Sequence, residues 1–147
     1  MHLEILIDTK KDKGVMKLST LKKMDKINET IETFPELSKP ISVVNLIKYT
    51  KQAYYNGNHK YYQLPTSQEQ NYIFSYTKNS NSDAGMLKNF VDSTGRYARI
   101  TTFMKDIGTD KMEIIQERLQ GVIAKEFPAD KFEVSITGKA LVFIKGT

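Results

Sequence analysis

Three segments of the chain alternate between apolar and polar residues, which is the pattern of a β-strand with one buried face. Leu3, Ile5 and Ile7 alternate with polar residues near the start of the sequence. The segments "RYARITTFM" (96–104) and "FEVSI" (132–136) alternate in the same way. We therefore predict a strand at each of these three places.

Four other segments carry apolar residues at steps of three and four, which places those residues on one face of a helix. The four segments are residues 21–34, 44–54, 72–76 and 112–127. Pro35 and Pro128 end the first and the last, because proline cannot donate the next helical hydrogen bond. Gly57 can take the left-handed conformation that often follows a helix, here the second. Ser67 and Gln70 have capping-box spacing before the third.

Two further segments favour extended structure. "PISVV" (40–44) is a candidate for a short fourth strand. In residues 87–106, two runs that favour strands flank "DSTG", and its Gly95 can take a positive φ angle, so we predict a β-hairpin there. Arg99 lies in the middle of the second arm, and we expect it to form an ion pair with an acidic residue.

The chain follows one plan twice. The run "LEILID", a helix ending in "ETFPE" and then "ISVV" is echoed by "ARITTFM", a helix ending in "KEFPA" and then "FEVSI". Two β-α-β units of this kind predict an α+β fold, the ferredoxin-like split β-α-β domain, with both helices on one face of a four-stranded antiparallel sheet. The halves would span about 1–43 and 96–138. A helical and β-hairpin insertion would occupy about 44–95.

Composition narrows the class of protein. The 147 residues suffice for one domain, and 39% apolar with 27% charged residues is typical of a globular chain. The net charge is +5, but all of the 22 basic residues except Arg96, Arg99 and Arg118 are lysines, and these are scattered along the chain. Because arginine supplies most bidentate contacts to bases, we predict a solvated lysine surface and no nucleic-acid partner.

Residues that carry enzyme chemistry are scarce. There is no cysteine, and His2 and His59 lie far apart, which leaves little material for a metal site or a Ser-His-Asp triad. Asp92, Asp106 and Asp110 form a candidate acidic group, but each occupies a turn or cap position that favours aspartate for local hydrogen bonding. We predict no catalytic residue, no cofactor and no metal, and hence no enzyme. An enzyme built on the three aspartates is the alternative.

The segment "AYYNGNHKYYQLP" (53–65) is rich in tyrosine. Tyr54, Tyr55, Tyr61 and Tyr62 are our candidates for a surface that contacts a lipid, another ligand or a partner subunit, because tyrosine combines apolar area with a polar tip. The alternative is that two of them continue the apolar stripe of the second helix and pack in the core.

The order of the motifs resembles a known family of membrane proteins. "PISVVNLIKYTKQAYYNG", a Leu-Pro pair, a helix, "FVDSTGRYARITTFMKDIG", a second helix and "VSITGKALV" follow one another here. This order is similar to that of the large extracytoplasmic loop domains of bacterial exporters of the resistance-nodulation-division superfamily. The nearest branch is that of the predicted exporters, which are related to the mycobacterial large membrane proteins. The family usually has an acidic residue where Asn45 stands.

The resemblance implies a function and a location. It implies a porter-type domain on the periplasmic face of the bacterial inner membrane, within a multi-pass, proton-driven exporter of lipids or other hydrophobic molecules. The domain would contribute a substrate cleft and conformational coupling without catalysis, since the family's proton-relay residues lie in membrane helices. Its partners would be those helices, the other loop domain, the hydrophobic substrate and, in a homo-oligomer, a second copy.

The end of the sequence bears on the alternative. The resemblance implies that residues 139–147 are a truncated connector to a membrane helix. The rival hypothesis is a free-standing ferredoxin-like binding or regulatory module that self-associates. Such a module should bury Leu141, Val142 and Phe143, whereas a truncated connector should leave them exposed or disordered.

Overall fold

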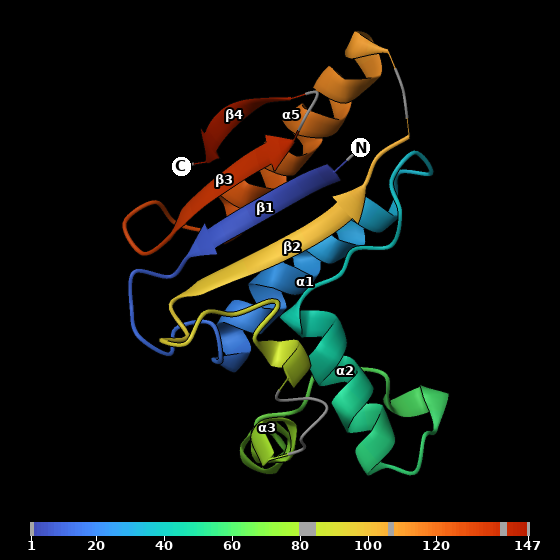
Figure 1. Cartoon of the computed structure of the whole chain (residues 1–147), viewed down its shortest axis with the longest axis vertical. Helices are drawn as coiled ribbons and strands as arrows, with labels where there is room; N and C mark the ends of the chain where they lie inside the picture. Colours follow the sequence, from blue (N-terminus) through green and yellow to red (C-terminus); the bar gives the residue numbers. More distant parts are fainter. Residues whose placement is uncertain (1, 80–84, 106–107, 139–140, 147) are drawn as a thin grey trace.

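The computed structural model has an α+β fold with a four-stranded antiparallel sheet (Figure 1). It describes residues 2–79, 85–105, 108–138 and 141–146. The strands are β1 (His2–Asp8), β2 (Tyr97–Phe103), β3 (Glu133–Gly138) and β4 (Leu141–Gly146). Their order across the sheet is β2-β1-β3-β4, and each pairs with its neighbour in antiparallel orientation.

Strand β1 is hydrogen-bonded on both edges, so its register with β2 and β3 determines which of their side chains share a face. Ile5 lies opposite Ile100 on β2 and opposite Ile136 on β3. Because side chains alternate between faces, this register gathers the apolar residues of all three strands on one face, where they are buried. The three strands predicted from alternation are therefore confirmed.

Two long helices cover the apolar face of the sheet. They are α1 (Leu18–Glu32) and α5 (Thr109–Glu126), and in Figure 1 both lie behind the strands. Their buried stripes are Leu21, Met24, Ile27 and Ile31 on α1 and Ile115, Leu119 and Ile123 on α5. After α5, the buried ring of Phe127 meets that of Phe132 edge to face at 5.1 Å. The first and last predicted helices are confirmed.

Helices α2 (Val43–Tyr54) and α3 (Gln70–Asn79) and the 3-10 turn η1 (His59–Tyr61) gather beyond the β2 edge of the sheet (Figure 1). Asn56 and Gly57, just after α2, have φ angles of 62° and 79°, the left-handed conformation expected at that helix end. The second and third predicted helices are therefore confirmed.

The capping box before α3 lies one residue earlier than predicted. The backbone N–H of Thr66 donates to Glu69 Oε1 at 2.9 Å, and the N–H of Glu69 donates to Thr66 Oγ1 at 3.3 Å. The predicted pair, Ser67 and Gln70, was wrong because a Thr-Glu pair at the same spacing satisfies two free N–H groups at the helix start.

The predicted strand at 40–44 was wrong except at Ile41. Ile41 forms an isolated antiparallel bridge with Thr101. Helix α2 then starts at Val43, because the Val44 N–H donates to Ser42 Oγ at 3.2 Å and the Ser42 N–H donates to Asn45 Oδ1 at 3.1 Å. This reciprocal cap outweighs the preference of the β-branched residues for extended structure.

Only the second arm of the predicted hairpin at 87–106 is a strand. The first arm is a helical turn followed by one bridge, between Val91 and Ala98. The Asp92 carboxylate accepts the N–H of Tyr97 at 2.9 Å, and the Asp92 N–H donates to the Tyr97 carbonyl at 3.2 Å, so side-chain and backbone bonds together close the turn after this single bridge. Gly95 has the expected positive φ angle, 72°.

Two further sequence predictions concern Arg99 and the end of the chain. Arg99 pairs with Glu4 at 3.9 Å, which confirms the predicted ion pair, although β2 is an edge strand of the sheet. Residues 141–146 form β4 and extend the sheet beyond β3. The side chains of Leu141, Val142 and Phe143 lie outside the described residues, so their burial or exposure stays a prediction.

We expect Gly95→Ala to destabilise the chain by about 2 kcal/mol or more. A Cβ at this position would lie 2.9 Å from the Cα of Lys13, and the φ angle of 72° disfavours any residue with a side chain. Urea unfolding measures the change. Gly121→Ala is the matched control, because it lies in α5 with open space around it and should stabilise by ~0.5 kcal/mol. Equal effects of the two substitutions would contradict this account of the turn.

Candidate functional site

Helix α2 positions the tyrosine-rich segment. Its buried side carries Val44 and Ile47 into the core, while Tyr54 and Tyr55 lie at its last turn. The left-handed residues after Tyr55 reverse the chain, so that η1 contacts α2. Gln52 stabilises this reversal of the chain, because its Nε2 donates a hydrogen bond to the carbonyl of Gly57 at 3.0 Å. The predicted residues therefore share one end of α2.

Three of the four predicted tyrosines join one aromatic cluster. The ring of Tyr55 stacks on that of Tyr61, with centroids 4.1 Å apart, and Tyr54 meets Tyr55 edge to face at 5.3 Å. Tyr54 also contacts Tyr72 and Tyr76 of α3 at 5.1 and 5.9 Å. The cluster joins α2 to α3. Tyr54 is 45% exposed, so the idea that it packs in the core was wrong.

A buried ion pair lies beside this cluster. Lys51 Nζ is 2.7 Å from Glu69 Oε1, and the hydroxyl of Tyr55 donates to Glu69 Oε2 at 2.5 Å. Burial by itself would raise the pKa of Glu69, but hydrogen bonds from Lys51, Tyr55 and the Thr66 N–H outweigh burial and lower that pKa to about 2. The hydrogen bond to Glu69, followed by that with Tyr72, raises the pKa of Tyr55. The hydroxyl of Tyr55 is thus committed to holding the two helices together.

Tyr62 lies apart from the cluster and lines an apolar groove. The groove has a volume of about 520 Å³. It is lined by Ile41, Ser42, Asn45, Leu46, Tyr49, Tyr62, Met86 and Phe90. Tyr49 is 60% exposed, Met86 48% and Ile41 46%, which is a large exposure for apolar side chains gathered at one place. Asn45 supplies a polar end and donates to the Tyr62 hydroxyl at 3.4 Å.

Sequence reasoning missed most of this groove. Tyr49 stands off the apolar stripe of α2, and an apolar residue on the polar side of a helix is the feature that would have identified it. Ile41 was assigned to the interior of a strand. Phe90 lies in the segment predicted as the first hairpin arm and Met86 lies just before it, and no local pattern relates either residue to α2.

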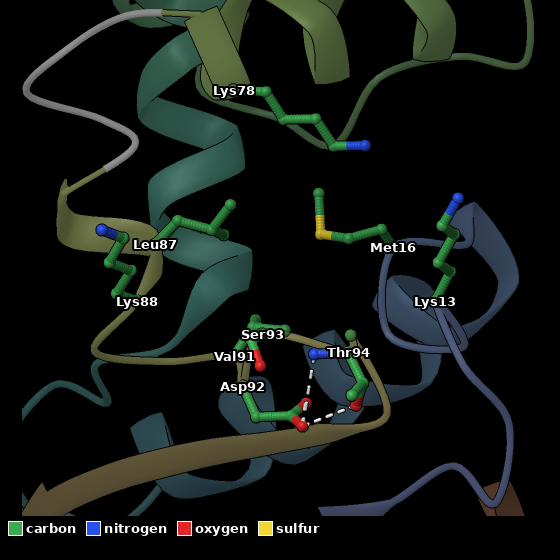
Figure 2. A pocket seen from close by; sticks show the side chains of 10 residues that line it. Lys13, Met16, Lys78, Leu87, Lys88, Val91, Asp92, Ser93 and Thr94 are labelled. Carbon is green, nitrogen blue, oxygen red and sulfur yellow. Dashed lines mark hydrogen bonds between the residues drawn. The ribbon is translucent and has the colours of Figure 1, made fainter.

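A second pocket lies on the other side of the 86–91 turn (Figure 2). Its volume is about 640 Å³. It is lined by Lys13, Met16, Lys78, Leu87, Lys88, Val91, Asp92, Ser93, Thr94 and Gly95. Within the turn, Met86 and Phe90 line the groove while Leu87 and Val91 line the pocket. One turn of chain thus separates two mostly apolar hollows.

The acidic group considered for catalysis does not assemble in the described part of the chain. The carboxylate of Asp92 accepts hydrogen bonds from Thr94 and from the Tyr97 N–H, and Asp110 lies in the first turn of α5. Asp106 lies outside the described residues. His2 packs edge to face on Phe103, with ring centroids 4.5 Å apart. Across the described residues, no three His, Asp or Glu side chains are grouped closely enough to hold a metal ion.

No protein-family model, curated protein or solved structure matches the chain significantly. Among the described residues, the helices are all too short or too polar to cross a bilayer. The residues of the two hollows are therefore the basis for assigning a function.

We expect the ion pair of Lys51 with Glu69 to make stability depend on acid. Because the pKa of Glu69 is about 2 in the fold and about 4.5 when unfolded, its contribution is full above pH 4.5 and is lost as the pH falls toward 2. The loss should be on the order of 2 kcal/mol. Urea unfolding between pH 5.5 and 2.5 measures it.

The matched variant for this prediction is the double substitution Lys51→Met with Glu69→Gln, which leaves no unpaired buried charge. It should lose less stability than the wild type over the same pH range. Tyr55→Phe removes one of the hydrogen bonds that lower the pKa of Glu69, and it should give an intermediate loss. Identical losses in all three proteins would contradict the assignment.

Proposed function

We propose that the chain is an extracytoplasmic, non-catalytic domain of a proton-driven exporter of the resistance-nodulation-division superfamily, which moves lipids or other hydrophobic molecules. It would lie on the periplasmic face of the bacterial inner membrane and act with the membrane helices and the other loop domain of the same protein. The observation that carries this proposal is the apolar groove beside α2, which exposes Ile41, Tyr49, Tyr62 and Met86 together. A concave apolar surface of this size suits a hydrophobic ligand. The motif order described above supports the same assignment.

The fold that accompanies this proposal is the ferredoxin-like split β-α-β domain, with its second strand reduced to a single bridge. Strands β2 and β3 are both antiparallel to β1 and are joined through α5, which makes one β-α-β unit. Strand β1, α1 and Ile41 make the other. Ile41 bridges Thr101, and Thr101 pairs on its other side with Glu4 of β1. One residue thus occupies the place of the second strand of that fold, and β4 is an additional strand beside β3.

The groove has a location that suits conformational coupling. Ile41 and Ser42 form the link by which the chain leaves the sheet and enters α2. Met86 and Phe90 belong to the link by which it returns to β2. Because both links line the groove, a hinge movement of α2 and α3 relative to the sheet would widen or narrow it. Such a movement is the contribution that we assign to this domain in a transport cycle.

A second candidate is a free-standing module that self-associates through its sheet. The sheet face opposite α1 and α5 exposes Leu6 at 40%, Tyr97 at 46% and Phe103 at 46%. Apolar residues on an open sheet face are a common basis for association. Concentration-dependent dimerisation that Phe103→Ser abolishes would favour this candidate.

We expect an antibody raised against this chain to detect, in fractionated source cells, a membrane-bound protein several times larger than 16.9 kDa. An exporter carries this domain together with many membrane helices, so the band should stay with the membranes after a high-salt wash. An immunoblot of the membrane and soluble fractions makes the measurement. A soluble band at the mass of the chain itself would reject the exporter and favour the self-associating module.

We expect the isolated chain to bind the neutral apolar fluorophore N-phenyl-1-naphthylamine in the groove. Tyr62→Ala combined with Met86→Gln removes apolar area from two walls and should weaken binding by about tenfold. Fluorescence titration measures the affinity. Tyr97→Ala is the matched control, because Tyr97 is equally exposed but lies on the open sheet face. Wild-type affinity in the double variant would remove the groove as the binding surface.

A further inference from the structure

We propose that the pocket in Figure 2 is a binding site for a single-chain amphiphile with an anionic head, such as a fatty acid carboxylate. The chain of the ligand would lie on the apolar floor and its head would lie among three lysines at the rim. This site is separate from the groove, and the inference holds for either candidate function.

The floor of the pocket is apolar and comes from distant parts of the chain. Met16 precedes α1, while Leu87 and Val91 belong to the turn before β2. Val91 is 7% exposed, and Met16 and Leu87 are partly buried against the main core. A volume of about 640 Å³ lies within the range in which ligand pockets bury small molecules. These features suit an aliphatic chain.

The rim of the pocket is positively charged. Lys13, Lys78 and Lys88 line it from three sides, and all three are exposed (Figure 2). Across the described residues, no ion pair joins any of these lysines to a carboxylate. Three like charges at the mouth of one apolar pocket attract an anion and disfavour a cation.

Among the described residues that line the pocket, Asp92 is the acidic one, and its carboxylate already accepts hydrogen bonds. It accepts the Thr94 hydroxyl at 2.6 Å and the Tyr97 N–H at 2.9 Å. Figure 2 shows the carboxylate turned toward Thr94. Burial alone would raise the pKa of Asp92, but these hydrogen bonds lower it below its usual value. Asp92 therefore shapes the floor and is not a partner for the rim lysines.

The floor is also held in place before any ligand arrives. The Lys13 N–H donates to the Thr94 carbonyl at 2.8 Å, and the Val15 N–H donates to the Gly95 carbonyl at 2.9 Å. These bonds fix the loop that carries Lys13 and Met16 against the turn that carries the floor. A preformed pocket reduces the entropy cost of binding.

The side chains present also narrow the class of ligand. The lining residues given above include no aromatic ring, so a nucleotide base would have nothing on which to stack. A second lysine-rich hollow lies near the start of α1 and is more polar than the pocket in Figure 2. Two of its lysines donate hydrogen bonds to backbone carbonyls at the end of α5 or just beyond it. Those two are Lys10, bound to Ala129, and Lys23, bound to Glu126. The pocket in Figure 2 combines an apolar floor with lysines that form no ion pair within the part of the chain that the structure describes.

Isothermal titration calorimetry with decanoate, 1-decanol and decyltrimethylammonium tests the proposal on the isolated chain. Decanoate should bind at least tenfold more tightly than either of the others, and its affinity should fall as salt is raised. The variant Lys13→Gln, Lys78→Gln, Lys88→Gln should bind decanoate about tenfold more weakly and leave 1-decanol unchanged. Lys60→Gln, an exposed lysine on η1, is the control and should match the wild type.

Two further measurements distinguish the contribution of the ligand's anionic head from that of its aliphatic tail. Leu87→Asn should weaken decanoate and 1-decanol equally, since it alters only the floor, and acetate should not bind measurably. Equal binding of decanoate and decyltrimethylammonium, or unchanged decanoate affinity in the triple variant, would overturn the proposal. Because the groove variants leave these residues intact, failure here is distinct from failure of the exporter assignment.

Discussion

The arrangement of both hollows depends on the outer edge of β2. Among the described residues no full strand pairs with that edge, and alternate residues along it form hydrogen bonds to the two segments that connect the sheet with α2 and α3. The Arg99 N–H donates to the Phe90 carbonyl at 3.0 Å. Two residues later, Thr101 exchanges backbone hydrogen bonds with Ile41 at 2.8 and 3.0 Å. Because an unpaired strand edge needs partners, the sheet holds both links of the insertion side by side.

This constraint explains why the groove exists. Ile41 and Phe90 are almost fifty positions apart in the sequence, but neighbouring positions on one strand edge bring them together. Helix α2 then starts directly after Ile41, because Ser42 and Asn45 cap it, and its exposed Tyr49 faces the same space. The apolar side chains remain exposed because the two links occupy the edge as single bridges and provide no second layer above them.

Periodicity in the sequence predicted the parts of the fold in which burial decides the structure. The alternating segments around Ile5, Ile100 and Ile136 became paired strands, and the stripes at steps of three and four became helices. Prediction failed where a side chain bonds its own backbone. Ser42 turned a β-branched run into a helix start, and Asp92 closed a turn that had been predicted as a hairpin. Such competition depends on one or two atoms, and a hydrophobic pattern does not record it.

The candidate site was less predictable than the fold. The sequence singled out the tyrosine-rich segment, but it could not show that the Tyr55 hydroxyl bonds to Glu69 while Tyr62 lines a groove. The lysines scattered along the chain were predicted to be a solvated surface. Lys13, Lys78 and Lys88 come together only because separate loops and α3 meet around the turn before β2. The spacing of these three lysines in the sequence does not indicate that they line one pocket.

The turn at 86–91 is therefore the element through which the two hollows would affect each other. Its residues are held by local bonds, from the Asn89 N–H to the Met86 carbonyl and from the Val91 N–H to the Leu87 carbonyl. One side of the turn lines the groove and the other lines the pocket. A ligand that displaces this turn from within one hollow must also move the apolar side chains of the turn that line the other hollow. Because packed walls rearrange as units, occupancy of either hollow would change the shape of the other.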